Sequence, residues 1–160
     1  MTEKKKNAEQ IAGEILRLSR NMLLVNLRFL DAALNQLELR PVAASSLLTD
    51  GEHLCYRPEW VLRTFQTAKE IPVRDYLHVV MHCIFRHMYM SPSIDREYWD
   101  LACDIAAEYV ITGLGIKAAE APRQEEQKQY FKAIQHDLNH VTAEKLYAYL
   151  RQTAPNPMRL

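Results

Sequence analysis

The chain has 160 residues, 48% of them hydrophobic, which is enough for one domain with its own core. Its 20 basic and 20 acidic side chains balance, and this zero net charge argues against a nucleic-acid-binding protein, which usually carries a basic excess. No apolar run reaches the roughly 18 residues of a membrane-spanning helix and no secretory signal is evident, so we expect a cytoplasmic protein that does not enter membranes. Three cysteines without C-x-x-C spacing indicate reduced thiols rather than a disulfide framework.

The first half of the chain predicts helices around one hairpin. Residues 1–7 are charged and polar and are expected to form a flexible tail, whereas residues 8–38 have helical apolar spacing and no proline. Residues 45–57 contain an Asp-Gly pair between two apolar runs, which predicts a short β-hairpin. A proline then begins a predicted helix over residues 58–68.

The second half predicts four helices, over residues 72–88, 97–112, 123–136 and 142–150. The first is apolar on all sides, which is typical of a central, buried helix. Two glycines end the second, and Thr142 is a candidate N-cap of the last.

These elements predict a predominantly helical α+β fold with a small β-hairpin. We expect a single domain over residues 1–153, built around the two apolar helices. Residues 154–160 are expected to be a tail or the start of a linker.

The first apolar helix carries a candidate metal site, because His78 and His82 are four residues apart. This spacing places both imidazoles on one face of a helix, where they can share one zinc ion. Polar side chains on an otherwise apolar helix need partners, and a metal is one such partner. Core histidines that are satisfied by hydrogen bonds are the alternative.

A third histidine follows His82 by five residues. On a regular helix His87 would point about 140° away from His82. It can therefore join the site only if the helix ends or unwinds near Arg86. We expect His87 to be either a further ligand or an outer residue that supports the site.

The second apolar helix offers two carboxylates, Asp104 and Glu108, one turn apart on the same face. An aspartate inside an apolar helix is expected to be buried against a cation, and the zinc of the two histidines would be such a cation. The alternative is an ion pair with Arg86 or Arg96. Glu108 is the best candidate for a carboxylate that lies near the metal without binding it, unless it only reaches solvent.

At these residues the chain resembles the zincin-like metallopeptidase domain that precedes VWA-like domains in many bacterial proteins. That family has an H-E-x-x-H helix with a further histidine, followed by W-x-x-A-x-D. The shared frame runs from about residue 47 to residue 111 and includes the hairpin segment Leu54-Cys-Tyr-Arg-Pro58. The matching positions are His78, His82, His87, Trp99, Ala102 and Asp104. The resemblance implies one zinc ion held by His78, His82 and Asp104.

The chain departs from the family at the glutamate, whose position is taken by Val79. In zinc peptidases this glutamate moves a proton from the metal-bound water to the leaving amine, and valine can do neither. We therefore expect a zinc-binding, metallopeptidase-like domain that lacks ordinary peptidase activity and acts in recognition or assembly. The alternatives are an active metallohydrolase with Glu108 as a relocated base and a metal-free helical interaction domain.

The resemblance also implies partners. Proteins of this arrangement often continue into a VWA-like domain and occur with MoxR-type AAA+ ATPases. The 160 residues contain no D-x-S-x-S motif, so a VWA-like domain would lie beyond Leu160. A peptide or protein ligand is also expected, and nucleic acid is not.

Overall fold

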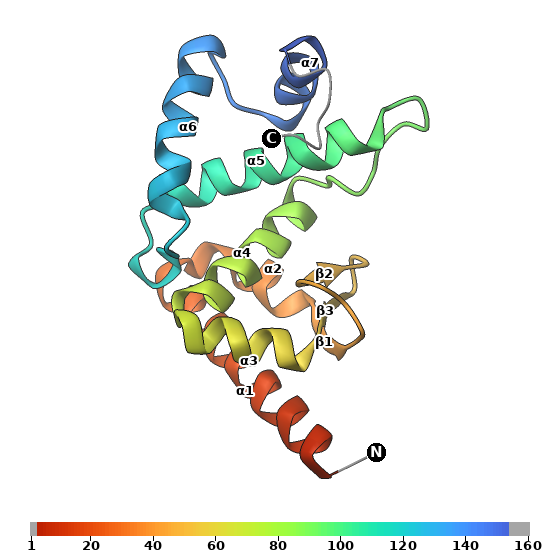
Figure 1. Ribbon diagram of the computed structural model, residues 1–160, viewed down its shortest axis with the longest axis vertical. Helices are drawn as coiled ribbons and strands as arrows, with labels where there is room; N and C mark the ends of the chain where they lie inside the picture. The colour runs from red at the N-terminus through yellow and green to blue at the C-terminus, as the bar shows by residue number, and fades with distance from the viewer. Residues whose placement is uncertain (1–2, 154–160) are drawn as a thin grey trace.

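A computed structural model describes residues 3–153, and within this range the chain forms seven α-helices and three short strands (Figure 1). The elements are α1 (Glu3–Asn26), η1 (Arg28–Leu30), α2 (Asp31–Gln36), β1 (Glu38–Pro41), β2 (Leu48–Thr49), β3 (His53–Tyr56), α3 (Pro58–Thr67), α4 (Glu70–Ile84), α5 (Arg96–Leu114), η2 (Lys117–Ala119), α6 (Gln124–Asp137) and α7 (Ala143–Thr153). The predicted fold class, a predominantly helical α+β fold, is confirmed.

The small sheet contains the predicted hairpin and one strand that the sequence did not predict. Strands β2 and β3 are antiparallel, and Gly51 between them has a φ of 96°, as the Asp-Gly turn requires. The Asp50 side chain closes the turn by accepting hydrogen bonds from the backbone N–H groups of Glu52 and His53. Strand β1 pairs in parallel with β3, although its residue Glu38 had been assigned to a helix.

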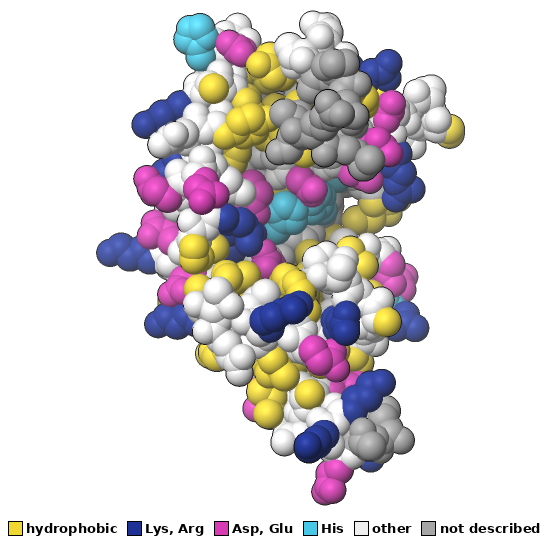
Figure 2. Space-filling model, in the orientation of Figure 1, with side chains coloured by type: hydrophobic (Ala, Val, Ile, Leu, Met, Phe, Trp, Pro, Cys, Tyr) yellow, Lys and Arg dark blue, Asp and Glu magenta, His cyan; other side chains and the backbone are white. Residues whose placement is uncertain are grey.

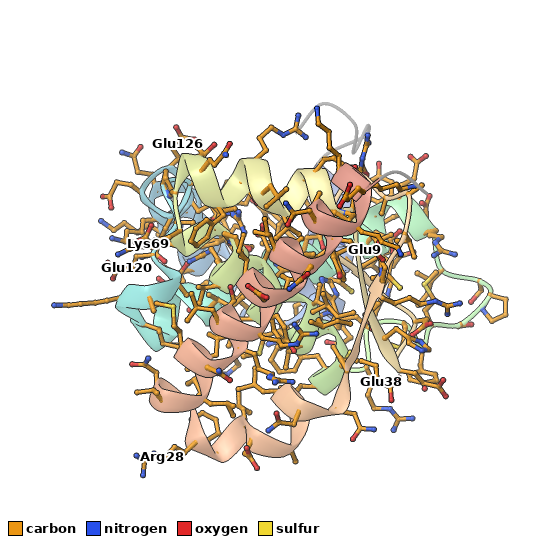
Figure 3. All side chains as sticks on the ribbon, turned by 90° about the horizontal axis from the view of Figure 1, so that it is seen from below. Glu9, Arg28, Glu38, Lys69, Glu120 and Glu126 are labelled. Atoms are coloured by element: carbon orange, nitrogen blue, oxygen red, sulfur yellow. The ribbon has the colours of Figure 1, made fainter. Side chains whose placement is uncertain are left out.

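The lower half of the molecule in Figure 1 has its own hydrophobic core, and α4 passes through it. Helices α1, α2 and α3 and the sheet surround this helix, whose buried residues lie on all sides, as its apolar composition predicted. The Tyr76 hydroxyl is fully buried and donates to the Leu34 carbonyl, so α4 is also tied to α2 by a hydrogen bond. Figure 3 shows the same half from below, with Arg28 and Glu38 at the rim of the packed interior.

The upper half has a second core between α5, α6 and α7 (Figure 1). Helix α5 presents small side chains to α7, and Ala102 and Ala106 are almost fully buried there. Small residues allow two helices to approach closely, so large residues of α7, such as Leu146 and Leu150, fill the space. Because Ala107 and Ile111 of α5 belong to the lower core, α5 joins the two halves.

Several helix ends differ from the sequence prediction. Helix α4 ends at Ile84 rather than near residue 88, and Arg86 beyond it has a positive φ of 56°. Helix α5 ends at a left-handed Gly115, as its glycines predicted. Residues 3–7, expected to be a tail, lie in the exposed first turns of α1. The expected segment 154–160 lies outside the described residues.

Two other expectations bear on chemistry. All three cysteines are free thiols, but only Cys103 is buried, while Cys55 and Cys83 are partly exposed. Among the described residues, no helix combines the length and apolar character needed to cross a membrane.

Candidate metal centre

Helices α4 and α5 bring three candidate ligands to one point. The Nε2 atoms of His78 and His82 are 2.8 Å apart, as their spacing on one helix face predicted. From α5, Oδ1 of Asp104 lies 3.2 Å from Nε2 of His78 and 3.1 Å from Nε2 of His82. Figure 2 shows histidine side chains in a hollow between the two halves of the molecule. The structure therefore places these three residues together at the floor of a cleft.

The spacing of these atoms fits a zinc ion. Ligand atoms about 2.0–2.1 Å from a tetrahedral zinc lie about 3.3 Å from one another. The three separations, 2.8, 3.1 and 3.2 Å, need to increase by only a few tenths of an ångström. Two imidazoles and one carboxylate also form a donor set that zinc accepts. The residues present therefore fit the metal.

Asp104 is exposed to the cleft, so the expectation that it is buried was wrong. Its side chain is 59% exposed, and its oxygen contacts the two histidines. The alternative ion pairs are not formed, because Arg96 pairs with Asp100 and the Arg86 guanidinium lies over the Tyr89 ring. Burial would raise the Asp104 pKa, but hydrogen bonds from His78 and His82 outweigh it and hold the pKa well below its usual value.

Glu108, one turn further along α5, holds the other side of His78. Its Oε1 is 2.8 Å from Nδ1 of His78, and its Oε2 accepts a 2.7 Å hydrogen bond from Nε of Arg74. The side chain is only 8% exposed, so it does not simply reach solvent. Burial would raise the Glu108 pKa, but the His78 hydrogen bond and the charges of Arg123 and Arg74 outweigh it and hold the pKa well below its usual value.

Arg74 is a central residue of the site that sequence reasoning missed. Its side chain is fully buried, and it donates to Glu108, to Thr112, to Gln127 and Gln124 of α6, and to the Ala119 carbonyl. Its signal was present in the sequence, because an arginine in an all-round apolar helix needs buried acceptors just as a histidine does. The acceptors that Arg74 finds could not be predicted from the sequence in the same way, because they come from the distant elements α5, η2 and α6.

His87 reaches the site because α4 ends before it. The positive φ of Arg86 turns the chain, and the Trp99 indole N–H donates to the His87 carbonyl at 2.9 Å. Nδ1 of His87 then lies 3.1 Å from Nδ1 of His82, on the side of that ring away from Asp104. Burial and the neighbouring His82 lower the pKa of His87 to about 4. The structure thus brings His87 to His82 and not into the cluster of three ligand atoms.

In the protein without metal, His78 holds a proton strongly. Burial alone would lower its pKa, but its hydrogen bonds with Asp104 and Glu108 raise it to about 9. The proton on His78 thus supplies part of the positive charge that a bound metal cation would bring to the site. Binding of a metal at Nε2 must displace that proton, so protons and metal compete for the site.

Val79 lines the same cleft as the ligands. It is 4% exposed and packs with the lower core, and its side chain has no group that can accept a proton. The cleft has a volume of about 650 Å³ and extends from Arg96 and Asp100 on α5 past the histidines to Arg123, the N-cap of α6, and Gln127 on α6. Its other wall is formed by residues 46–49, which include β2, and by Trp60 of α3.

A comparison with known protein families identifies the chain's relatives at the level of a family. The model of a family described as a putative metallopeptidase domain matches residues 19–157, most of the chain. Neither the curated proteins nor the solved structures include a match to the chain. The matched range contains every residue of the cleft described above.

Proposed function

The chain belongs to this family of putative metallopeptidase domains, and from that premise we propose that it binds one zinc ion through His78, His82 and Asp104 without ordinary peptidase activity. Its role is then recognition or assembly, with a peptide or protein ligand entering the cleft. The observation that carries the proposal is the convergence of the three ligand atoms, all within 4.8 Å of one another, beside Val79.

The surroundings of the histidines support a metal-binding role. Histidines that bind metals usually donate their other ring N–H to a carboxylate or another acceptor, which fixes the ring and its tautomer. Glu108 is placed to accept this N–H from Nδ1 of His78, and His87 is placed to accept it from Nδ1 of His82. Each Nε2 atom is thereby left facing the common point. A bound zinc would supply a Lewis acid that attracts a ligand oxygen, nitrogen or sulfur in the cleft.

The contacts of Glu108 argue against an active metallohydrolase in which this residue replaces the missing base. A general base needs a free acceptor within reach of the water that it deprotonates. The two Glu108 oxygens already accept from His78, Arg74 and Arg123, and its lowered pKa makes it a poor proton acceptor. Glu108 is therefore better suited to orient His78 than to carry protons.

Metal binding is tested by elemental analysis of protein expressed with added zinc. We expect about one zinc per chain and a fall in melting temperature when a chelator removes it, because a metal that binds only the folded state stabilises it. His78→Ala should abolish the bound zinc, whereas His136→Ala, at an exposed position far along α6, should not. If the purified protein contains no zinc and a chelator leaves its melting temperature unchanged, the chain would instead be a metal-free interaction domain.

The absence of hydrolysis is tested by restoring the family glutamate. We expect no chelator-sensitive cleavage of peptide libraries by the unchanged protein and measurable cleavage by Val79→Glu. Val79→Gln is the matched control, because glutamine is polar and has nearly the same size and shape as glutamate but carries no basic carboxylate. Chelator-sensitive cleavage by the unchanged protein that is lost in Glu108→Gln, with zinc retained, would establish the relocated base and overturn our proposal.

We also propose that the domain works beside a VWA-like domain of the same polypeptide and with a MoxR-type AAA+ ATPase. This rests on the resemblance of the histidine helix and the Trp99 to Asp104 segment to the family in which those partners occur. Affinity purification of the natural full-length protein should recover the ATPase, and recovery should fall when His78→Ala removes the metal. Recovery of no ATPase at all would contradict this assignment.

A further inference from the structure

Arg123 lies at the α6 end of the cleft with part of its guanidinium unused. Its Nη2 donates to Oδ1 of Asp75 at 2.5 Å and to Oε1 of Glu108 at 3.1 Å. Its Nε and Nη1 atoms make no hydrogen bond with the described part of the chain, and neither is a buried unsatisfied atom. The side chain is 36% exposed and lines the cleft, so these two donors are accessible to a ligand.

Gln127 adds a second donor one helical turn away. Its Oε1 accepts from Nη2 of Arg74 at 3.3 Å, and because arginine only donates, this contact fixes the amide with its NH₂ group on the other side. That NH₂ group has no protein partner among the described residues, and Gln127 also lines the cleft. Residues four apart on a helix share a face, so the two sets of donors are neighbours.

The charges around the cleft favour an anionic ligand once a metal is bound. Arg74 and Arg123 balance Glu108 and Asp75, with which they are paired. A divalent metal on two neutral histidines and Asp104 leaves one positive charge in excess. This excess favours anionic ligands, and an arginine fork with an amide donor has the hydrogen-bonding geometry that a carboxylate accepts.

We propose that Arg123, assisted by Gln127, receives a carboxylate of the ligand whose other polar group binds the metal. The inference rests on the proposed metal site. Glu108 Oε1 contacts both Nδ1 of His78 and Nη2 of Arg123, so only one carboxylate and one imidazole ring separate the metal position from the arginine. A ligand that spans a few bonds can therefore contact both. If Arg123 serves only to neutralise Asp75 and Glu108, the cleft will show no preference for a carboxylate.

The experiment uses the whole chain loaded with cobalt, which reports thiolate binding through a charge-transfer absorption band. The probes are 3-mercaptopropionate and its neutral amide, 3-mercaptopropanamide, which differ only in the carboxylate. We expect the acid to bind at least about tenfold more tightly, because a hydrogen bond to a charged carboxylate is stronger than one to a neutral amide. Equal affinity for the two probes in the unchanged protein would overturn the proposal.

Three substitutions assign the preference to Arg123. Arg123→Gln should bring the ratio of the two affinities close to one, and survival of the ratio in this variant would overturn the assignment. Asp75→Asn should increase the ratio, because it removes a competing negative charge and keeps Arg123. Arg96→Gln is the matched control, since Arg96 lies at the opposite end of the same cleft and should leave the ratio unchanged. Cobalt loading is measured first for the unchanged protein and for every variant. If the unchanged protein takes up no cobalt, the proposed metal site itself is refuted.

Competition then separates the two sources of such a carboxylate. An acetylated tripeptide with a free carboxyl terminus, its C-terminal amide and succinate are each titrated against bound 3-mercaptopropionate. Displacement by the free peptide but not its amide assigns the site to the ends of peptide chains, and displacement by succinate alone assigns it to small organic acids. Displacement by none of the three would contradict a carboxylate ligand.

Discussion

Two carboxylates one turn apart on α5 face the same histidine and lie in opposite surroundings. The Asp104 side chain is 59% exposed, and within residues 3–153 its carboxylate pairs with the Nε2 atoms of His78 and His82 alone. The Glu108 side chain is 8% exposed and contacts His78 on its far nitrogen, together with Arg74 and Arg123. The two side chains therefore share His78 as a partner, while their exposure and their other partners differ.

The difference shows that the neighbouring cation decides what a carboxylate does here. Glu108 faces Arg74, a cation that is part of the protein and fully buried, so its charge is compensated in the folded chain itself. Asp104 faces the open cleft and pairs there with two histidines, and a metal can take the place of the proton on His78. Glu108 is thus expected to matter for folding, and Asp104 for the metal.

The largest effect is expected from Glu108→Leu. It leaves the Arg74 guanidinium buried without its charged partner, which typically costs about 3–5 kcal/mol of the free energy of unfolding. Urea denaturation of the chelated protein measures this cost. Glu108→Gln keeps an acceptor for Arg74 and should lose less, and a Glu108→Leu protein as stable as the unchanged chain would remove the distinction between the two carboxylates.

The second effect concerns the metal. Asp104→Ala removes a proposed ligand, so the zinc affinity should fall by more than the roughly 10–100-fold typical of residues that only support a ligand. In the chelated protein the same change should cost less than about 1 kcal/mol of unfolding free energy, because solvent screens so exposed a carboxylate. Competition with a chromophoric chelator gives the affinity. Unchanged zinc binding in Asp104→Ala would show that the aspartate is not a ligand.

A smaller loss is expected from His87→Ala. His87 contacts Nδ1 of His82 and not the ligand cluster, so its removal should lower the zinc affinity by about 10–100-fold, as for other outer partners of metal ligands. His87→Gln restores a side-chain acceptor and should recover part of the affinity. A loss as large as that of His82→Ala would instead make His87 a ligand.

The fold class and the convergence of the three candidate ligands were readable from local patterns. The all-round apolar character of α4, the i,i+4 histidines and the aspartate on the next apolar helix are all properties of short segments. These properties were sufficient to predict that His78, His82 and Asp104 face one another. The Asp-Gly hairpin was predicted for the same reason, since its turn chemistry is contained in two residues.

What the sequence did not reveal depends on contacts between distant segments. Strand β1 forms only because β3 lies beside it, and its residues have no strong strand pattern of their own. The turn at Arg86 that brings His87 to His82 is held by Trp99, which lies 12 residues after His87, and no local signal marks this turn. The partners of Arg74 lie 34 to 53 residues further along the chain. Exposure of Asp104 was misjudged because the cleft exists only between the two halves.

The smallest effect is expected from pH in the chelated protein, where His78 and His87 act in opposite directions. The His78 pKa is raised from 6.5 to about 9, so its contribution to stability is fully present below pH 6.5 and is lost as the pH rises towards 9. The His87 pKa is lowered from 6.5 to about 4, so stability instead falls as the pH decreases from 6.5 to 4. Melting temperatures should therefore peak near pH 6.5, and His78→Gln should remove the decline on the alkaline side. Zinc should abolish the same decline in the unchanged protein, because the bound metal replaces the proton on His78. An alkaline decline that persists in His78→Gln would mean that another group titrates, and that the decline does not come from a protonated His78 that donates to both Asp104 and Glu108.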